Sequence, residues 1–414
     1  MSILFKSLRF VAEGEVKEAS DFLYDGKSVK KTTEEQLPDR FTTVDCTGFL
    51  GSRGWVDLRC LASEPGMEFR ETIASLCEGL RVSGFTEAVL MPNTVPVVQS
   101  KNEVAYIQQK SQAMFPTLHV QAAVTKDTAG EDFTEMIDLS HYGVKIFGDG
   151  IHPLANSDRF MKALQYLQKF GGILFDHSYD PLLALFGQMH EGIVSTKLGM
   201  KGIPGLAEEM AIQKNLSILK YTGGTLHLQA ISTAKSVDLI RKAKEEGLSV
   251  TADVSLYQLL FTDKDLVSFD TALKVLPPFR EEVDRVALME GLKDGTIDAL
   301  VSNHIPLDFD AKHSEFDLAA FGMIGLQTFA PGLAMLEKEL GWPLLIQKIT
   351  DGPRGVLGRR SEEWDSLTIF DPEETWYFDQ NNNVSLSANS PWFNRQLKGR
   401  VKFVINKGKF SQHL

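Results

Sequence analysis

Short runs of apolar residues alternate with amphipathic stretches through the middle of the chain. Segments with helical spacing separate these runs, such as residues 157–170 and 236–247, and Gly247 closes the second. Strands that alternate with helices predict a parallel (β/α)8 TIM barrel, although a doubly wound open sheet has the same local pattern. The eight apolar runs are residues 55–58, 86–91, 119–124, 143–147, 173–177, 226–230, 249–254 and 298–303.

The two ends of the chain have a different pattern. Residues 3–48 and roughly 364–414 show strand-like alternation without helices, as in segments 384–390 and 399–410. Turn signals occur at Asp25-Gly26 and at residues 381–383. We therefore expect both termini to form one small β-sandwich unit, made of residues 1–50 and 360–414, beside a barrel of residues 51–359.

Composition narrows the class of protein. The 414 residues suffice for one large barrel and a smaller unit, and 43% hydrophobic with 24% charged residues is ordinary for a globular protein. No apolar run approaches the ~20 residues of a membrane span, and charged residues interrupt the first apolar segment, so we expect a cytoplasmic protein. The net charge of −12, without a basic stripe, argues against nucleic acid as a partner. Three cysteines without CxxC spacing predict no disulfides.

In a barrel, chemistry lies where the strands end at the carboxyl-terminal face. The segments at these positions resemble, in order and spacing, those of the dihydroorotases, which belong to the cyclic amidohydrolase superfamily. The resemblance covers nearly the whole chain, and it includes residues 191–212 and the closing segment 389–401. The strand-end segments are DLRCLASEPG (57–66), MPNT (91–94), FGDG (147–150), DHSYD (176–180), LHLQAIST (226–233), KVLPPFR (274–280) and SNHIPLD (302–308).

The resemblance implies a zinc centre that polarises an amide carbonyl and generates hydroxide. Family sequences read DLHVHLREPG, HICHVST and TDHAPH where this chain reads DLRCLASEPG, HLQAIST and SNHIPL. Two implied ligand positions keep their residue type, at Asp149 and His177. Four are changed, to Arg59, Leu61, Ala230 and Asn303.

Two of these changes weigh most against catalysis. Asn303 stands where the family has the aspartate that acts as general base, and an amide does not accept a proton at physiological pH. A guanidinium at the position of Arg59, about 4 Å from Zn²⁺, would cost about 8 kcal/mol of repulsion at an effective dielectric constant of 20. We therefore expect no metal and no other cofactor, with zinc present only if the chain is an active enzyme.

The resemblance also implies contacts to the carboxylate of dihydroorotate. Of the corresponding positions only Asn93 keeps the family residue. The others have become Ser63, Leu276 and Leu307. Apolar side chains at polar-contact positions indicate a pocket that no longer suits this anion.

Other candidates have simpler structural interpretations. His304 and His227 are expected to be buried, hydrogen-bonded histidines, and strand alternation turns Cys60 away from the barrel mouth. Lys145 shares strand phase with Asp149, so we expect it to point inward and, together with Arg59, to form an ion-pair group around the Asp149 carboxylate. The glycines of segment 221–225 indicate a helix-to-strand turn rather than a phosphate loop.

Three functions remain open. The first, which we favour, is a pseudo-enzyme: a dihydroorotase-like scaffold of pyrimidine biosynthesis that assembles with aspartate carbamoyltransferase, as non-catalytic relatives do, and that is itself a homo-oligomer. The second is an active zinc-dependent dihydroorotase or other cyclic amidohydrolase with a rebuilt site. The third is a small-molecule sensor that uses the cleft around Asn93.

Overall fold

The computed structural model describes residues 2–33, 37–359 and 365–413. Eight parallel strands form the wall of a barrel, and each lies within or next to one of the apolar runs. A parallel bridge between Cys60 and His304 joins the first and last strands and closes the barrel. The predicted TIM barrel is therefore confirmed, and the alternative of a doubly wound open sheet is excluded. Its strands are β7 (Trp55–Cys60), β8 (Phe85–Leu90), β9 (Thr117–Ala122), β10 (Ile146–Phe147), β11 (Ile173–Asp176), β14 (Leu226–Leu228), β15 (Val250–Ser255) and β16 (Ala299–Val301).

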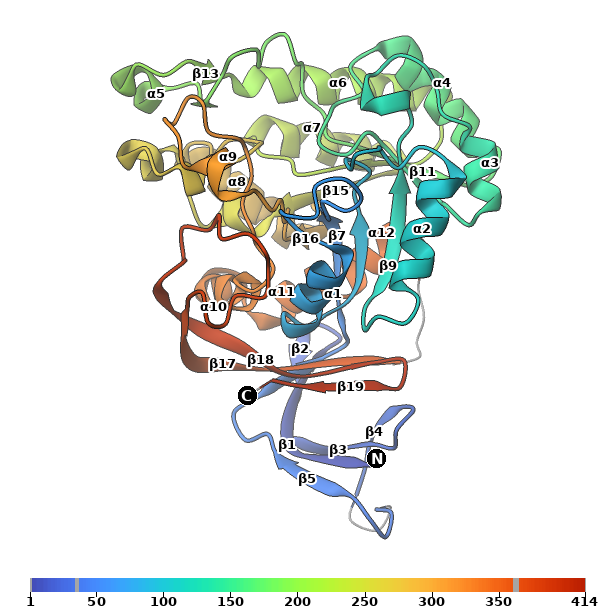
Figure 1. The fold of residues 1–414 in the computed structure, drawn as a ribbon, viewed down its shortest axis with the longest axis vertical. Helices are drawn as coiled ribbons and strands as arrows, with labels where there is room; N and C mark the ends of the chain where they lie inside the picture. Colours follow the sequence, from blue (N-terminus) through green and yellow to red (C-terminus); the bar gives the residue numbers. More distant parts are fainter. Residues whose placement is uncertain (1, 34–36, 360–364, 414) are drawn as a thin grey trace.

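Helices cover the outside of the barrel (Figure 1). Hydroxyl or amide side chains cap several of them at their first turn, including Thr72, Ser100, Asn156 and Thr233. The long helices are α1 (Ile73–Val82), α2 (Lys101–Ser111), α4 (Ser157–Gln168), α6 (Gly205–Thr222), α7 (Ala234–Glu245), α8 (Glu282–Lys293), α10 (Phe329–Leu340) and α11 (Trp342–Ile349). The shorter ones are α3 (Met136–His141), α5 (Ile193–Leu198), α9 (Phe309–Lys312) and α12 (Asp351–Val356).

The helix boundaries follow the sequence signals. Helix α7 ends at Glu245, and Glu246 is its C-cap. Gly247 follows in the left-handed conformation that favours glycine. Helix α6 ends at Thr222, and its C-cap Gly223 has a φ of 71° before the chain enters β14. The interpretation of segment 221–225 as a helix-to-strand turn is confirmed.

Both termini build one further sheet, which lies beside the barrel (Figure 1). Leu8 and Phe10 of β1 share an apolar core with Ile369 of β17 and Phe403 of β18, so the two halves of this sheet enclose a core. The predicted domain limit at residue 360 lies outside the described residues. The strands are β1 (Ile3–Ala12), β2 (Glu15–Val16), β3 (Ser20–Tyr24), β4 (Val29–Lys31), β5 (Thr42–Asp45), β6 (Leu50–Ser52), β17 (Ser366–Phe378), β18 (Arg395–Asn406) and β19 (Lys409–Gln412).

The prediction of a strand over residues 384–390 is wrong. This segment of the β17–β18 connection is irregular, because its polar side chains bond to backbone groups instead of leaving the backbone to pair with a strand. Asn383 Nδ2 donates to the carbonyl of Ser387 at 2.8 Å, and Asn389 Nδ2 donates to the carbonyl of Ile305 at 3.0 Å. The second bond ties the segment to the barrel. A small parallel pair, β12 (Met189–His190) with β13 (Gly202–Ile203), was not predicted.

No described helix combines the length and the apolar character that crossing a membrane requires.

Candidate functional site

A buried arginine crosses the barrel mouth. Arg59 on β7 is fully buried, and its Nε donates to Asn303 Oδ1 at 2.9 Å. Its Nη1 donates to Gln229 Oε1 at 2.9 Å and to the carbonyl of Gly150 at 3.3 Å. Because these partners follow β16, β14 and β10, the one side chain cross-links four strand ends. The other terminal nitrogen, Nη2, is buried and has no hydrogen-bond partner among the described residues.

Asn303 binds Arg59 through a neutral side-chain amide. Its Oδ1 accepts from Arg59, and its Nδ2 donates to the hydroxyl of Tyr257 and to the carbonyl of Leu276, the latter at 3.4 Å. Burial raises the pKa of Tyr257, so the phenol stays neutral. Asn303 has a φ of 45°, a conformation that asparagine tolerates better than most residues. The amide is therefore fixed in one orientation by partners on both sides.

Three buried aspartates, Asp57, Asp176 and Asp253, act on Arg59 through their charge without forming a direct ion pair with it. Burial lowers the pKa of Arg59, and the negative charge of Asp253, followed by that of further groups, opposes this shift. Burial raises the pKa of Asp57 to about 6, and it also raises the pKa of Asp176. These three carboxyls oppose the charge of the buried guanidinium over a longer range. Asp149, at the same mouth, has its pKa raised to about 6 by burial.

Ala230, just after β14, has a strained backbone conformation. Its φ is 50°, which costs a residue with a Cβ on the order of 1–2 kcal/mol. Its amide N–H donates to Asp253 Oδ1 at 2.5 Å, and Asp253 Oδ2 is bonded to His227 Nε2 at 2.9 Å. The Asp253 carboxylate thus holds the left-handed turn, although the alanine side chain offers no ligand atom.

Asp149 and His177 lie at the same mouth, each engaged with the backbone. Asp149 Oδ1 accepts from the amides of Val124 at 2.9 Å and Thr125 at 3.0 Å, and its Oδ2 accepts from the Thr125 hydroxyl at 2.5 Å. His177 Nδ1 donates to the carbonyl of Ile151 at 3.1 Å. Burial, with the charge of Arg59, lowers the pKa of His177 to about 3, so the imidazole is neutral.

An apolar cluster stands beside Arg59 at the mouth. Leu61 and Leu307 pack together with Met91 and Ile305, and Ile151 lies against them. Leu61 occupies an implied ligand position and Leu307 an implied substrate contact, so both changes contribute to a single apolar packing unit. Burying these side chains stabilises the mouth by roughly 1.5–3 kcal/mol for each fully buried leucine.

Among the other residues at implied substrate-contact positions, Asn93 has hydrogen-bond partners within the protein, whereas the Ser63 hydroxyl has none among the described residues. Asn93 Nδ2 donates to the carbonyl of Asp149 at 3.1 Å, and its Oδ1 accepts from the amide of Ile151 at 3.0 Å. Asn93 therefore holds the loop after β10. Ser63 is buried with no hydrogen-bond partner for its Oγ among the described residues, and Leu276 is half-buried.

Comparison with known proteins indicates the family of this chain. A family model described as dihydro-orotase-like matches residues 50–236. A dihydroorotase of Geobacter metallireducens is 33% identical over 423 residues, covering 99% of each chain. A dihydroorotase of Pelotomaculum thermopropionicum is 35% identical over 405 residues, covering 96% of this chain and 94% of that protein.

This chain belongs to the dihydroorotase family. Its fold also matches an L-hydantoinase (dihydropyrimidinase) from Arthrobacter aurescens, with a TM-score of 0.85 and 20% identity, covering 99% of this chain and 96% of the other. The predicted membership of the family is confirmed.

The mouth does not fit the zinc centre that the dihydroorotase resemblance implies. Zinc in proteins takes three or four side-chain ligands of the His, Cys, Asp or Glu type. Over residues 2–33, 37–359 and 365–413, no group of three or more such residues is placed to hold a metal ion. His177 and Asp149 supply two donors at most, and the guanidinium of Arg59 lies beside them.

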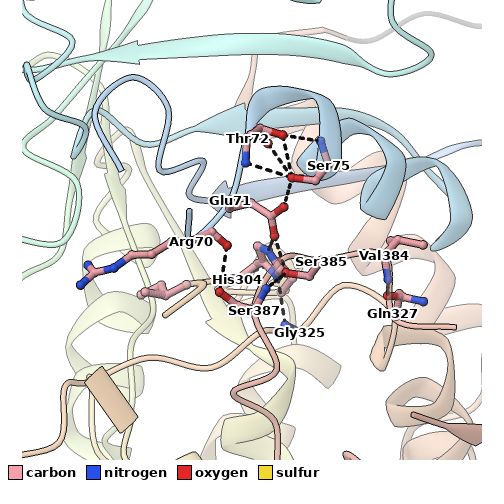
Figure 2. A network of polar contacts seen from close by, with 12 residues as sticks. Arg70, Glu71, Thr72, Ser75, His304, Gly325, Gln327, Val384, Ser385 and Ser387 are labelled. Carbon is pink, nitrogen blue, oxygen red and sulfur yellow. Dashed lines mark hydrogen bonds and ion pairs between the residues drawn. The ribbon is translucent and has the colours of Figure 1, made fainter. Parts of the chain in front are cut away.

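The histidines outside the implied ligand set are structural, as predicted. His227 is fully buried between Thr251 Oγ1, at 2.8 Å, and Asp253. His304 points away from Asn303 into a separate polar network, shown in Figure 2, where its Nε2 faces Glu71 Oε2 at 3.4 Å. Its Nδ1 accepts from the amide of Gly325 at 3.2 Å, and Ser385 of the β17–β18 connection donates to the same Glu71 oxygen. This network ties that connection to the barrel.

The prediction that Lys145 points inward and forms an ion-pair group with Arg59 around Asp149 is wrong. Lys145 is exposed at the amino-terminal end of β10, the opposite end of the barrel from Arg59. Strand β10 is only two residues long, so the period-two alternation assumed between residues 145 and 149 does not hold. Cys60 is turned away as predicted, since its Sγ donates to the carbonyl of Val89 at 3.3 Å.

Sequence reasoning missed the polar partners that make Arg59 tolerable. Gln229 lies in the strand-end segment 226–233 and Asp253 in the apolar run 249–254, but spacing along one strand does not reveal which side chain reaches across the barrel. One signal was available. A buried arginine requires acceptors, and Gln229 directly precedes the changed position at Ala230.

Proposed function

We propose that this chain is a non-catalytic member of the dihydroorotase family that acts as a structural partner of aspartate carbamoyltransferase in pyrimidine biosynthesis, as a homo-oligomer without a bound cofactor. The observation that carries the proposal is the buried Arg59, bonded to Asn303 and Gln229 at the position of an implied zinc ligand. A cation fixed there opposes a second cation, and the amide of Asn303 cannot act as the base.

The role in assembly rests on the family resemblance. The chain matches the Geobacter dihydroorotase over 99% of both lengths, while the mouth lacks the ligand set that the family resemblance implies. A shared scaffold without these ligands suits a protein that acts through its surface.

Metal analysis paired with a dihydroorotate hydrolysis assay tests the loss of catalysis. The purified chain should contain far less than one zinc per chain, both as isolated and after incubation with zinc followed by desalting, and should show no turnover above the uncatalysed rate. The Geobacter enzyme, prepared in parallel, is the positive control. Stoichiometric zinc together with turnover in this chain would refute the proposal.

The assembly role needs a separate test. The transferase from the same organism, mixed with this chain at micromolar concentration, should elute with it as one larger species in size-exclusion chromatography with light scattering. Two independent peaks at every mixing ratio would reject the partnership and leave the loss of catalysis unaffected.

A further inference from the structure

A long groove lies at the amino-terminal ends of the barrel strands, opposite the mouth. It consists of two adjoining hollows of about 770 Å³ and 350 Å³, which share Gln108 and Leu118. Its walls are the end of α2 and the start of β9 on one side and the β18–β19 turn with residues 357–359 on the other. Figure 1 shows the β18–β19 turn below α2. We name it the amino-terminal groove. Its volume suits a small organic ligand.

The charged side chains that line the amino-terminal groove are all basic. Lys407 and Lys409 lie at one end, and Lys145 and Arg359 at the other, and no aspartate or glutamate is among the described lining residues. The chain has 55 acidic and 43 basic residues, so a groove of this size without a carboxylate departs from the balance of the protein. Another hollow of about 680 Å³ is lined by Glu337 and Glu373 as well as by basic residues.

The three lysines of the groove form no ion pair with a described carboxylate, and two of them are held by hydrogen bonds to neutral groups. Lys407 Nζ donates to Thr117 Oγ1 at 3.0 Å, and Lys409 Nζ donates to the carbonyl of Ala113 at 3.1 Å. Neither lysine, nor Lys145, forms an ion pair with a described carboxylate. These contacts position the ammonium groups and leave their charge available to a ligand.

The arginine end also carries excess positive charge. Although burial opposes the shift, His119, Arg354 and Arg359 lower the pKa of Glu87 to about 2, so its carboxylate is ionised. This one carboxylate faces both guanidiniums, with Arg354 at 3.3 Å and Arg359 closer, while the Arg359 side chain remains 47% exposed. Because the Arg359 side chain stays this exposed while it is paired with Glu87, its guanidinium can also contact an anion at the groove.

We propose that the amino-terminal groove binds a small molecule that carries two or more phosphate groups. Ammonium and guanidinium groups are the side chains that proteins use for phosphate, and their placement at both ends requires negative charge at more than one point. The larger hollow is also lined by Gln109, Gln112 and Tyr142, and Tyr142 is 44% exposed. These groups would contact the rest of the molecule. The proposal is independent of the proposed assembly function.

Inorganic triphosphate is a direct probe of the groove. Isothermal titration of the full chain at constant ionic strength should give one site per chain, and the same anion should raise the unfolding temperature, because it binds only the folded state. Orthophosphate, which reaches one end of the groove at a time, should bind at least about tenfold more weakly. Equal affinity for the two anions would overturn the proposal.

Matched variants locate the site. The double variant Lys407→Met/Lys409→Met should weaken triphosphate binding about tenfold or more, and Lys145→Met should weaken it severalfold. The control Lys338→Met/Lys398→Met removes the same charge from the 680 Å³ hollow and should leave the affinity unchanged. An equal loss in the control would mean nonspecific attraction. Binding of polyglutamate without binding of triphosphate would assign the groove to an acidic protein segment. Either outcome refutes the proposal.

Discussion

The two ends of the barrel hold positive charge in opposite ways. At the mouth, Arg59 is fully buried, bonded to two neutral side chains and flanked by the cluster of Leu61 and Leu307. At the amino-terminal groove, Lys407 and Lys409 are exposed and bonded to neutral groups that leave them charged. A cation sealed inside the barrel stabilises the scaffold. A cation in an open groove remains available to a ligand.

This difference changes how the mouth should be understood. The mouth has not merely lost ligands, because Arg59, Asn303 and Gln229 form a set of side chains connected by hydrogen bonds. A connected set of this kind resists single substitutions, since each change leaves a buried group without its partner.

The largest expected effect comes from rebuilding the implied zinc site. The variant Arg59→His/Leu61→His/Ala230→His/Asn303→Asp, together with Asp149 and His177, restores all six implied positions and should bind roughly one to two zinc ions per chain. Metal analysis after dialysis measures the gain over the unchanged chain.

A matched variant isolates the contribution of the guanidinium. It carries the other three substitutions and keeps Arg59, and it should bind far less zinc because the cation remains beside the site. Equal zinc content in the two variants would show that the charge of Arg59 does not prevent zinc binding. It would contradict the view that the buried cation at the mouth excludes a metal ion.

The next largest effect is on folding. Arg59→Ala removes a guanidinium from among buried aspartates, leaves the acceptors on Asn303 and Gln229 without their donor, and creates a cavity. The free energy of unfolding in urea should fall by roughly 3–5 kcal/mol. Arg241→Ala, which breaks a partly exposed pair with Asp294, should cost about 1 kcal/mol or less. Similar losses for both variants would contradict a structural role for the buried cation.

The sequence predicted the wall of the barrel better than its interior contacts. Each strand produced a readable apolar run because both of its faces are buried, and the position of Arg59 followed from alignment with the DLHVHLREPG motif. Gln229 was missed, because a contact between β7 and the end of β14 depends on how far the barrel curves. Lys145 was assigned to the wrong end because β10 is too short to keep its alternation.

The buried aspartates give a smaller, pH-dependent effect. The folded-state pKa of Asp149, about 6, lies above the ordinary 3.8, so the folded chain holds this proton more tightly than the unfolded chain. The resulting stabilisation is complete below the ordinary value and is lost as the pH rises through 6. The unfolding free energy of the native chain, relative to Asp149→Asn, should therefore fall by up to about 3 kcal/mol from acidic to mildly alkaline pH. A difference that stays constant with pH would contradict this assignment.

The smallest expected effect on stability belongs to the groove, and it sharpens the contrast between the two ends. Lys407→Met/Lys409→Met removes two charges but only exposed bonds to Thr117, Ala113 and Met114, so the unfolding free energy should change by about 0.5 kcal/mol or less. Urea unfolding of this variant beside Arg59→Ala compares the two ends directly. A loss of several kcal/mol in the lysine variant would mean that these cations also serve the scaffold, and weaker triphosphate binding by the variant would then no longer locate a ligand in the groove.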